Sequence, residues 1–179
     1  MPQTGGMLRD LDLPATLTTR SGSYLIRNAV SADLEALILL LSDDPVSAGC
    51  GDVASDDDRP LYGAALDRIV EDPANSLLVV VDLAGGVIAT MQLTVIPGMA
   101  RRGATRLLVE AVRVGSAQRS NGIGGSMMRW VTGTAAIGLG AQLVQLTSDA
   151  ARTDAHRFYQ RLGFAASHIG YKYNVKVVQ

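Results

Sequence analysis

Residues 109–126 read Val109-Glu110-Ala111-Val112-Arg113-Val114-Gly115-Ser116-Ala117-Gln118-Arg119-Ser120-Asn121-Gly122-Ile123-Gly124-Gly125-Ser126, and this stretch decides the fold. It opens with an apolar, β-branched run that predicts a strand, and it passes through a short polar loop into a helical pattern. A glycine-rich turn at a helix N-terminus can bind an anion, because the first helical N–H groups are unpaired and carry the positive end of the helix dipole. The stretch therefore predicts either a phosphate-binding turn or a turn whose glycines only pack the helix against the sheet.

Two common phosphate-binding motifs do not fit this turn. A P-loop requires a lysine directly after its last glycine, but Ser126 follows Gly125 here. A dinucleotide-binding turn lies in an early βαβ unit and is followed about 20 residues later by an acidic residue. Residues 142–145 contain no acid, and the turn lies well into the second half of the chain. The remaining pattern is Arg119-x-x-Gly122-x-Gly124 directly after a strand that ends at Val114.

A second motif lies nearer the C-terminus. Leu146-Thr147-Ser148-Asp149 is followed by Ala155-His156-Arg157-Phe158-Tyr159-Gln160-Arg161-Leu162-Gly163-Phe164. The two motifs together resemble the GNAT superfamily of N-acetyltransferases, whose pattern Ala-x-x-Phe-Tyr-x-x-x-Gly-Phe is matched at every fixed position. The resemblance covers about residues 24–178. The second motif, with Ser167-His168 shortly after it, is also similar to aminoalkylphosphonate N-acetyltransferases.

The order of predicted elements agrees with this resemblance. Residues 1–23 are expected to form a flexible, poorly ordered leader, and 24–179 a single domain. We predict strands at 24–27, 76–82, 87–96, 105–114 and 143–147, helices from the N-cap Ser31 to 41, around 62–69, at 123–137 and at 151–162, and a final strand in the β-prone residues 171–178. The order β-α-α-β-β-β-α-β-α-β predicts an α/β fold (α+β mixed sheet), the GNAT fold, with helices on both faces.

The resemblance implies that the chain uses acetyl-CoA (coenzyme A). In the family, the pantetheine arm pairs with strand backbone and the pyrophosphate lies against loop amides. Ser120 stands where the family often has glycine, and Arg152 stands where many members have an asparagine that contacts pantetheine. An arginine there can instead reach a phosphate or an anionic substrate. The implied cofactor-binding residues are Val112, Val114, Arg119, Ser120, Asn121, Gly122, Ile123, Gly124, Gly125, Ser148, Arg152 and Phe158.

Two residues are candidates for catalysis. Glu110 is an acid in an otherwise apolar strand and could take a proton from an ammonium, directly or through water. For this role we expect Glu110 to be partly buried, which would tune its pKa. The alternative is a structural carboxylate, paired for example with Arg113 or Arg106 at a strand end. The resemblance implies that Tyr159 donates a proton to the coenzyme A thiolate, since a phenol keeps its proton at neutral pH. The alternative is core packing, because Tyr159 lies in a helical apolar stripe. Ser148 is a lesser candidate near the thioester.

Composition excludes several other classes of function. The formal net charge is −1 and no basic block occurs, so we expect no nucleic acid and no membrane surface as a partner. One cysteine, Cys50, allows no intramolecular disulfide, suits the cytoplasm and is interpreted as a spectator. His156 and His168 lack metal-ligand spacing, so we predict no metal. The acidic run Asp56–Asp58 is either a solvated loop or a weak attractant for a cationic substrate.

The sequence therefore predicts an acetyl-CoA-dependent N-acetyltransferase that acts by direct transfer to a primary amine of a small molecule. A protein or peptide amine is the alternative within the class. A non-catalytic acyl-CoA-binding module is the alternative outside it, and an unrelated nucleotide-phosphate binder is a weaker one. The presence of both Glu110 and Tyr159 favours the enzyme, because a pure binder needs only the loop. The resemblance is also compatible with a homodimer.

Overall fold

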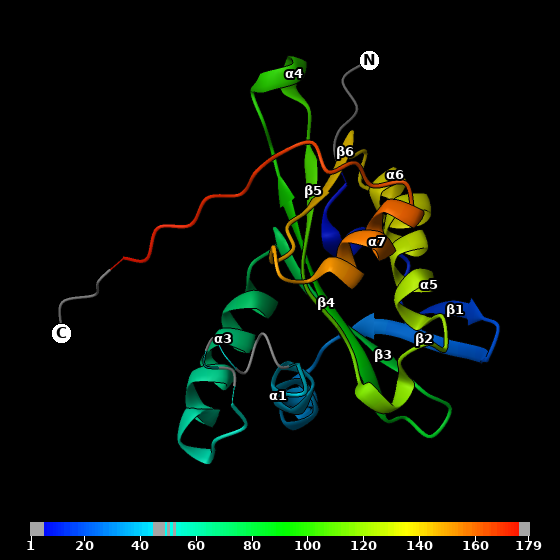
Figure 1. The fold of residues 1–179 in the computed structure, drawn as a ribbon, viewed down its shortest axis with the longest axis vertical. Helices are drawn as coiled ribbons and strands as arrows, with labels where there is room; N and C mark the ends of the chain where they lie inside the picture. The colour runs from blue at the N-terminus through cyan, green and yellow to red at the C-terminus, as the bar shows by residue number, and fades with distance from the viewer. Residues whose placement is uncertain (1–5, 45–48, 50, 52, 176–179) are drawn as a thin grey trace. The chain divides into compact units, whose positions relative to one another are not determined.

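The computed structural model describes residues 6–44, 49, 51 and 53–175. Six strands form one sheet in the order β1-β2-β3-β4-β5-β6, and all neighbours are antiparallel except β5 and β6 (Figure 1). The strands are β1 Ala15–Thr19, β2 Gly22–Asn28, β3 Asn75–Val81, β4 Val87–Ile96, β5 Arg106–Val114 and β6 Leu143–Leu146. The predicted mixed α/β fold with a central sheet flanked by helices is confirmed.

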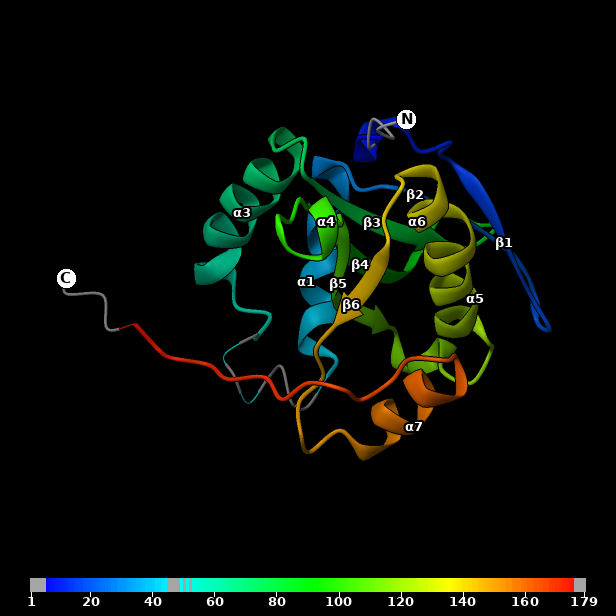
Figure 2. The ribbon, with the colours of Figure 1, turned by 90° about the horizontal axis from the view of Figure 1, so that it is seen from above.

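Helices cover both faces of this sheet (Figure 2). One face carries α1 Leu34–Ser42 and α3 Arg59–Glu71, and the other carries a helical segment made of α5 Ile123–Trp130, a π-helical turn Val131–Ala135 and α6 Ala136–Gly138. Short helical turns occur at η1 Leu8–Asp10, η2 Ser31–Asp33, η3 Asp56–Asp58, α4 Ala100–Gly103 and η4 Ser116–Gln118. No described helix is long and apolar enough to cross a membrane.

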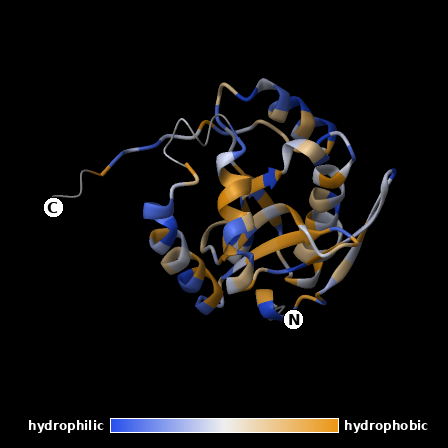
Figure 3. Ribbon diagram, turned by 90° about the horizontal axis from the view of Figure 1, so that it is seen from below, coloured by the Kyte–Doolittle hydropathy of each residue, from blue (hydrophilic) through white to orange (hydrophobic). Residues whose placement is uncertain are grey.

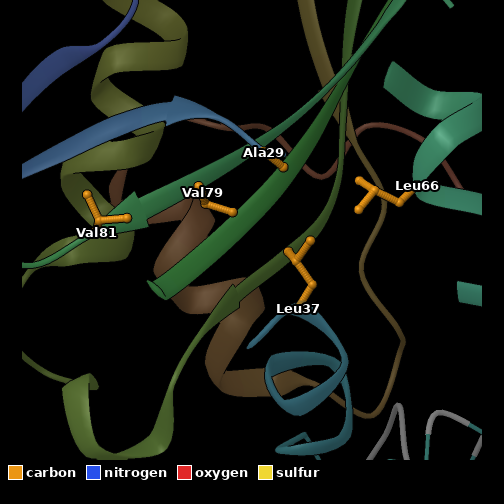
Figure 4. Close-up of a cluster of buried hydrophobic side chains, with 5 residues drawn as sticks. All are labelled: Ala29, Leu37, Leu66, Val79 and Val81. Carbon is orange, nitrogen blue, oxygen red and sulfur yellow. The ribbon is translucent and has the colours of Figure 1, made fainter. Parts of the chain in front are cut away.

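The most hydrophobic residues lie in the middle of the sheet (Figure 3). Under α1 and α3 they form a cluster of Ala29, Leu37, Leu66, Val79 and Val81, each at most 6% exposed (Figure 4). Burying a side chain such as Leu37 or Leu66 stabilises the fold by about 1.5–3 kcal/mol. The cluster holds both helices against β3, on the face of the sheet that also carries the candidate base Glu110.

The chain divides into two compact units, residues 1–146 and 147–179. The sheet and its covering helices belong to the first unit. The second contains α7 Thr153–Arg161, and in it the ring of Tyr159 packs edge-on against those of Phe158 and Phe164. The boundaries of a single domain at 24–179 stay a prediction.

The N-terminal region is more ordered than its sequence predicts. Ala15–Thr19 forms β1 and pairs with β2, and Leu8 and Leu17 are each only 2% exposed. The prediction of a poorly ordered leader over 1–23 is therefore wrong for this segment. Its signal was missed because β1 is an edge strand of only five residues with a single large apolar side chain, Leu17.

Asp33, not Ser31, stabilises the start of the first helical segment. Its carboxylate accepts hydrogen bonds from the backbone N–H of Val30 (2.9 Å) and from the guanidinium of Arg27 (2.7 Å). The hydrogen bond from Arg27 lowers the pKa of Asp33 below its ordinary value, and the same contact raises the pKa of Arg27. Asp33 is 6% exposed, so this pair ties β2 to the turn before α1 from a nearly buried position.

Two further predictions need correction. The helix predicted at 123–137 contains the π-helical turn Val131–Ala135, which inserts a residue, so that Ala135 is buried and Thr134 is exposed. No strand forms at residues 171–175, although a final strand is predicted over 171–178. Residues 176–178, like Cys50, lie outside the described part of the chain.

Candidate functional site

The strand pair β4–β5 carries a β-bulge in the middle of the predicted site. Gln92 pairs with Glu110, but Thr90 pairs with Arg113, so β5 contains one more residue than β4 over this interval. Ala111 occupies the bulge with a left-handed φ of 50°. A bulge bends a strand and ends regular pairing. Here the bulge lies next to the point at which pairing with β6 ends. Residues 106–109 of β5 are paired with strands on both sides, whereas residues 110–114 are paired only with β4.

Beyond the bulge, one edge of β5 is open. β6 pairs only with Arg106–Val109 and ends at Leu146, so no described strand lies beside residues 110–114 on that side. Val112 and Val114 fall in this open half. Their carbonyls accept hydrogen bonds from the guanidinium groups of Arg113 (2.9 Å) and Arg119 (3.2 Å), and each carbonyl oxygen has a second lone pair. An open strand edge can hydrogen-bond an extended, amide-bearing ligand.

The loop after β5 leads directly into the N-terminus of α5. Ser120 and Gly122 have positive φ angles of 69° and 80°, and Gly122 is the N-cap of the helix. The N–H of Ser126 makes the first helical hydrogen bond, to the carbonyl of Gly122 at 3.0 Å. The N–H groups of Ile123, Gly124 and Gly125 precede it and have no partner within the helix. The side chain of Asn121 braces the loop by donating to Gln118 at 3.1 Å.

The side chain of Arg119 holds the loop in place. Its guanidinium donates to the backbone carbonyl and the carboxylate of Asp43, at 3.2 and 3.3 Å. The same carboxylate accepts the N–H of Ser116 at 2.6 Å. The N–H of Arg119 itself donates to the carbonyl of Ser116 at 3.3 Å. Sequence reasoning missed Asp43, because it lies at the end of α1, more than 70 residues away.

Glu110 is exposed and stands on the face of the sheet that carries α1 and α3. It is directly opposite Gln92, and directly opposed residues of antiparallel strands share a face. The expected partial burial is therefore wrong. The side-chain carboxylate of Glu110 makes no hydrogen bond or ion pair with another residue within the described ranges. The two predicted partners lie elsewhere: Arg106 donates to Gln145 at 3.3 Å, and Arg113 is 4.0 Å from Asp44.

A cavity of about 110 Å³ lies next to these residues, between α1, α3 and the strands β3 to β5. Gln92 and Ala111 line it, so it borders both the bulge and the residue opposite Glu110. Most of its remaining lining is aliphatic. Sequence reasoning found the helices that enclose the cavity but not the cavity itself, which depends on their spacing from the sheet.

The remaining candidates belong to the second unit. Asp149 organises the turn before α7: its carboxylate accepts the N–H of Ala151 at 2.9 Å, and its carbonyl accepts the N–H of Arg152 at 3.0 Å. Arg152 is the N-cap of α7. The hydroxyl of Ser148 has no hydrogen-bond partner among the described residues. Ser148, Arg152, Phe158 and Tyr159 thus form one group of candidates, and Glu110, Val112, Val114 and Arg119–Gly125 form another, each within one compact unit.

No cluster of three or more His, Cys, Asp or Glu side chains suited to a metal occurs in the described part of the chain. The candidates of the first unit can bind an anion at the N-terminus of α5, bind an extended ligand along β5, and transfer a proton at the exposed carboxylate of Glu110.

Known proteins resemble this chain in sequence and in fold. The model of the acetyltransferase (GNAT) family matches residues 35–164. No curated protein gives a significant match. Among solved structures, a protein described as a transcriptional regulator from Bacillus halodurans C-125 is 34% identical, with a TM-score of 0.80 over 85% of this chain and 99% of that one.

Two less similar structures share the fold. A putative acetyltransferase from Agrobacterium tumefaciens str. C58 is 23% identical, with a TM-score of 0.68 over 84% of this chain and 99% of that chain. Glucosamine-6-phosphate N-acetyltransferase from Arabidopsis thaliana is 17% identical, with a TM-score of 0.67 over 86% and 99% of the respective chains. At these identities the likeness concerns the fold alone.

Proposed function

Because the chain belongs to the acetyltransferase (GNAT) family and is an N-acetyltransferase, we propose that it transfers the acetyl group of acetyl-CoA directly to a primary amine of a small molecule. One observation carries this proposal: the open edge of β5 leads without interruption into the loop and the unpaired N–H groups of α5. An extended acyl carrier with an anionic end would lie along these two features in turn. Family members use acetyl-CoA generally.

The residues present fit such a carrier. Residues 115–126 contain no acidic side chain, and the carboxylate of Asp43 beside them is paired with Arg119, so a pyrophosphate would meet no unpaired negative charge from these residues. The N–H groups at the start of α5 and the positive end of its dipole favour an anion. The backbone of Val112 and Val114 would hold the pantetheine amides. The thioester of acetyl-CoA supplies the activated acetyl group.

Glu110 and Tyr159 would carry the two proton transfers. Glu110 accepts a proton from the ammonium of the acceptor, directly or through water, so that the amine nitrogen can form its bond to the acetyl carbon. Tyr159 gives its phenolic proton to the sulfur as the carbon–sulfur bond breaks. No covalent acetyl-enzyme is needed. By the resemblance, Ser148, Arg152 and Phe158 would also take part in binding the cofactor.

The first experiment measures thermal stability with and without acetyl-CoA, in the parent and in Gly124→Glu. A ligand at 100 times its Kd stabilises a protein that binds it only when folded by about 2.7 kcal/mol. We expect a clear upward shift in the parent and none in the folded variant, because a carboxylate at Gly124 repels the pyrophosphate. Absence of a shift in the parent, with the protein folded and free of copurified coenzyme A, would refute the proposal.

Two alternatives have an observation in their favour. The relative at 34% identity is described as a transcriptional regulator, so a non-catalytic acyl-CoA-binding module is the second candidate function. It predicts the thermal shift but no acetylated amine. The motif at residues 155–159 resembles aminoalkylphosphonate N-acetyltransferases, so an aminoalkylphosphonate belongs in the acceptor panel. Tyr159→Phe in the same panel is expected to lower kcat and leave the thermal shift in place.

A further inference from the structure

The cavity beside Gln92 has an apolar interior. Leu37 and Ile38 of α1, Leu66 and Ile69 of α3, and Leu77 of β3 contribute to its lining. Its few polar lining side chains include Thr90, whose hydroxyl already donates to the carbonyl of Leu78 at 2.9 Å. No described lining residue carries a charge. A group that fills the cavity is therefore uncharged and apolar.

Gln92 also lines the cavity, and hydrogen bonds to its neighbours fix the orientation of its side-chain amide. The carboxylate of Asp72 can only accept, so the amide nitrogen of Asn75 donates to it at 2.8 Å. The oxygen of Asn75 then accepts from the amide nitrogen of Gln92 at 3.1 Å and from Thr94 at 2.6 Å. This chain of contacts leaves the amide oxygen of Gln92 available as an acceptor at the cavity.

The negative charge of Glu110 adjoins this acceptor. Glu110 is directly opposite Gln92 and precedes Ala111, and both of those residues line the cavity. Opposed side chains in an antiparallel pair have Cβ atoms about 4.5–5.5 Å apart. The cavity thus has an apolar interior beside an acceptor oxygen and a carboxylate, which is the complement of an ammonium attached to an apolar group.

We propose that the acceptor is a primary amine with an uncharged apolar substituent of about four to six carbons, a size set by comparison with a cavity of about 150 Å³ that holds benzene. This inference rests on the proposed function and specifies its substrate class. The substituent fills the cavity, while the ammonium meets Gln92 and Glu110. An acceptor with a phosphonate in the cavity would bury an anion without a cationic partner among the described lining residues, which is unfavourable.

The test compares kcat/KM for a series from ethylamine to octylamine and for 2-aminoethylphosphonate, with acetyl-CoA as donor. Burying each methylene is expected to raise kcat/KM about fourfold. The rise should stop near pentylamine or hexylamine, when the cavity is full. 2-Aminoethylphosphonate should be at least tenfold poorer than pentylamine.

Two variants locate the effect in the cavity. Ala65→Phe places a ring in the cavity and should flatten the chain-length dependence, whereas Ala64→Phe, on the exposed side of the same helix, should retain it. Should Ala65→Phe not fold, Ile69→Ala enlarges the cavity and should move the optimum to a longer amine.

The outcomes separate the inference from the proposed function. A flat or falling chain-length series, or a preference for 2-aminoethylphosphonate, overturns the apolar acceptor while amine acetylation still stands. Equal flattening in Ala64→Phe and Ala65→Phe also overturns it. If no amine and no peptide is acetylated although acetyl-CoA binds, the proposed function fails and the inference fails with it.

Discussion

The two halves of β5 differ although they belong to one strand of nine residues. From Arg106 to Val109 the strand is paired on both sides, and Leu107 and Val109 are at most 1% exposed. From Glu110 to Val114 it is paired only with β4, and no side chain is fully buried. The first half uses its backbone and side chains for stability. The second half retains backbone groups and a carboxylate that can meet a ligand, because pairing with β6 ends and the bulge begins there.

The largest effect should follow a change in the second half. Glu110→Gln removes the candidate base, and loss of general base catalysis typically lowers the rate about 10²–10⁴-fold. Since Glu110 is exposed and has no described partner, its removal should change the free energy of unfolding by less than about 0.5 kcal/mol. Steady-state kinetics and thermal melts measure both. Asp67→Asn, an exposed acid on α3, is the matched control and should retain parental rates. A parental rate in Glu110→Gln would assign the base role to another group.

A change in the first half should have the opposite profile. Leu107→Ala removes a fully buried side chain and should cost about 2–5 kcal/mol of stability. Denaturant unfolding measures this loss. The Kd for acetyl-CoA of the folded fraction should stay near the parental value, because Leu107 lies in the half of β5 that pairs with β6. If Leu107→Ala instead kept parental stability and bound acetyl-CoA more weakly, the proposed difference between the two halves of β5 would be wrong.

The smallest effect concerns the backbone at the bulge. Ala111 has a left-handed φ, which costs a residue with a Cβ about 1 kcal/mol, so Ala111→Gly should raise stability by up to that amount. Ala89→Gly, in the neighbouring strand without a positive φ, should instead lower stability by about 1 kcal/mol or more. Chemical denaturation of both variants gives the comparison. Destabilisation of similar size in both would mean that the bulge stores no backbone strain.

Local patterns were enough to predict the elements that carry the site. The strand ending at Val114, the turn at Gly122 and the start of α5 are each encoded within a few residues, by β-branched runs, glycines and helical periodicity. The same holds for α7, which is followed closely by Gly163 with a positive φ of 89°. The prediction failed for β1 and for the final strand, because weak local signals at the chain ends depend on whether a partner strand is present.

The sequence by itself thus determined the family, the mixed α/β fold and the identity of the candidate residues, since these follow from short-range patterns. Only the tertiary structure decided that Glu110 is exposed beside Gln92, that Arg119 is anchored to Asp43, and that a cavity lies next to the bulge. Each of these features joins residues far apart in the chain. Their contacts depend on strand register and helix packing, which no window of local sequence contains.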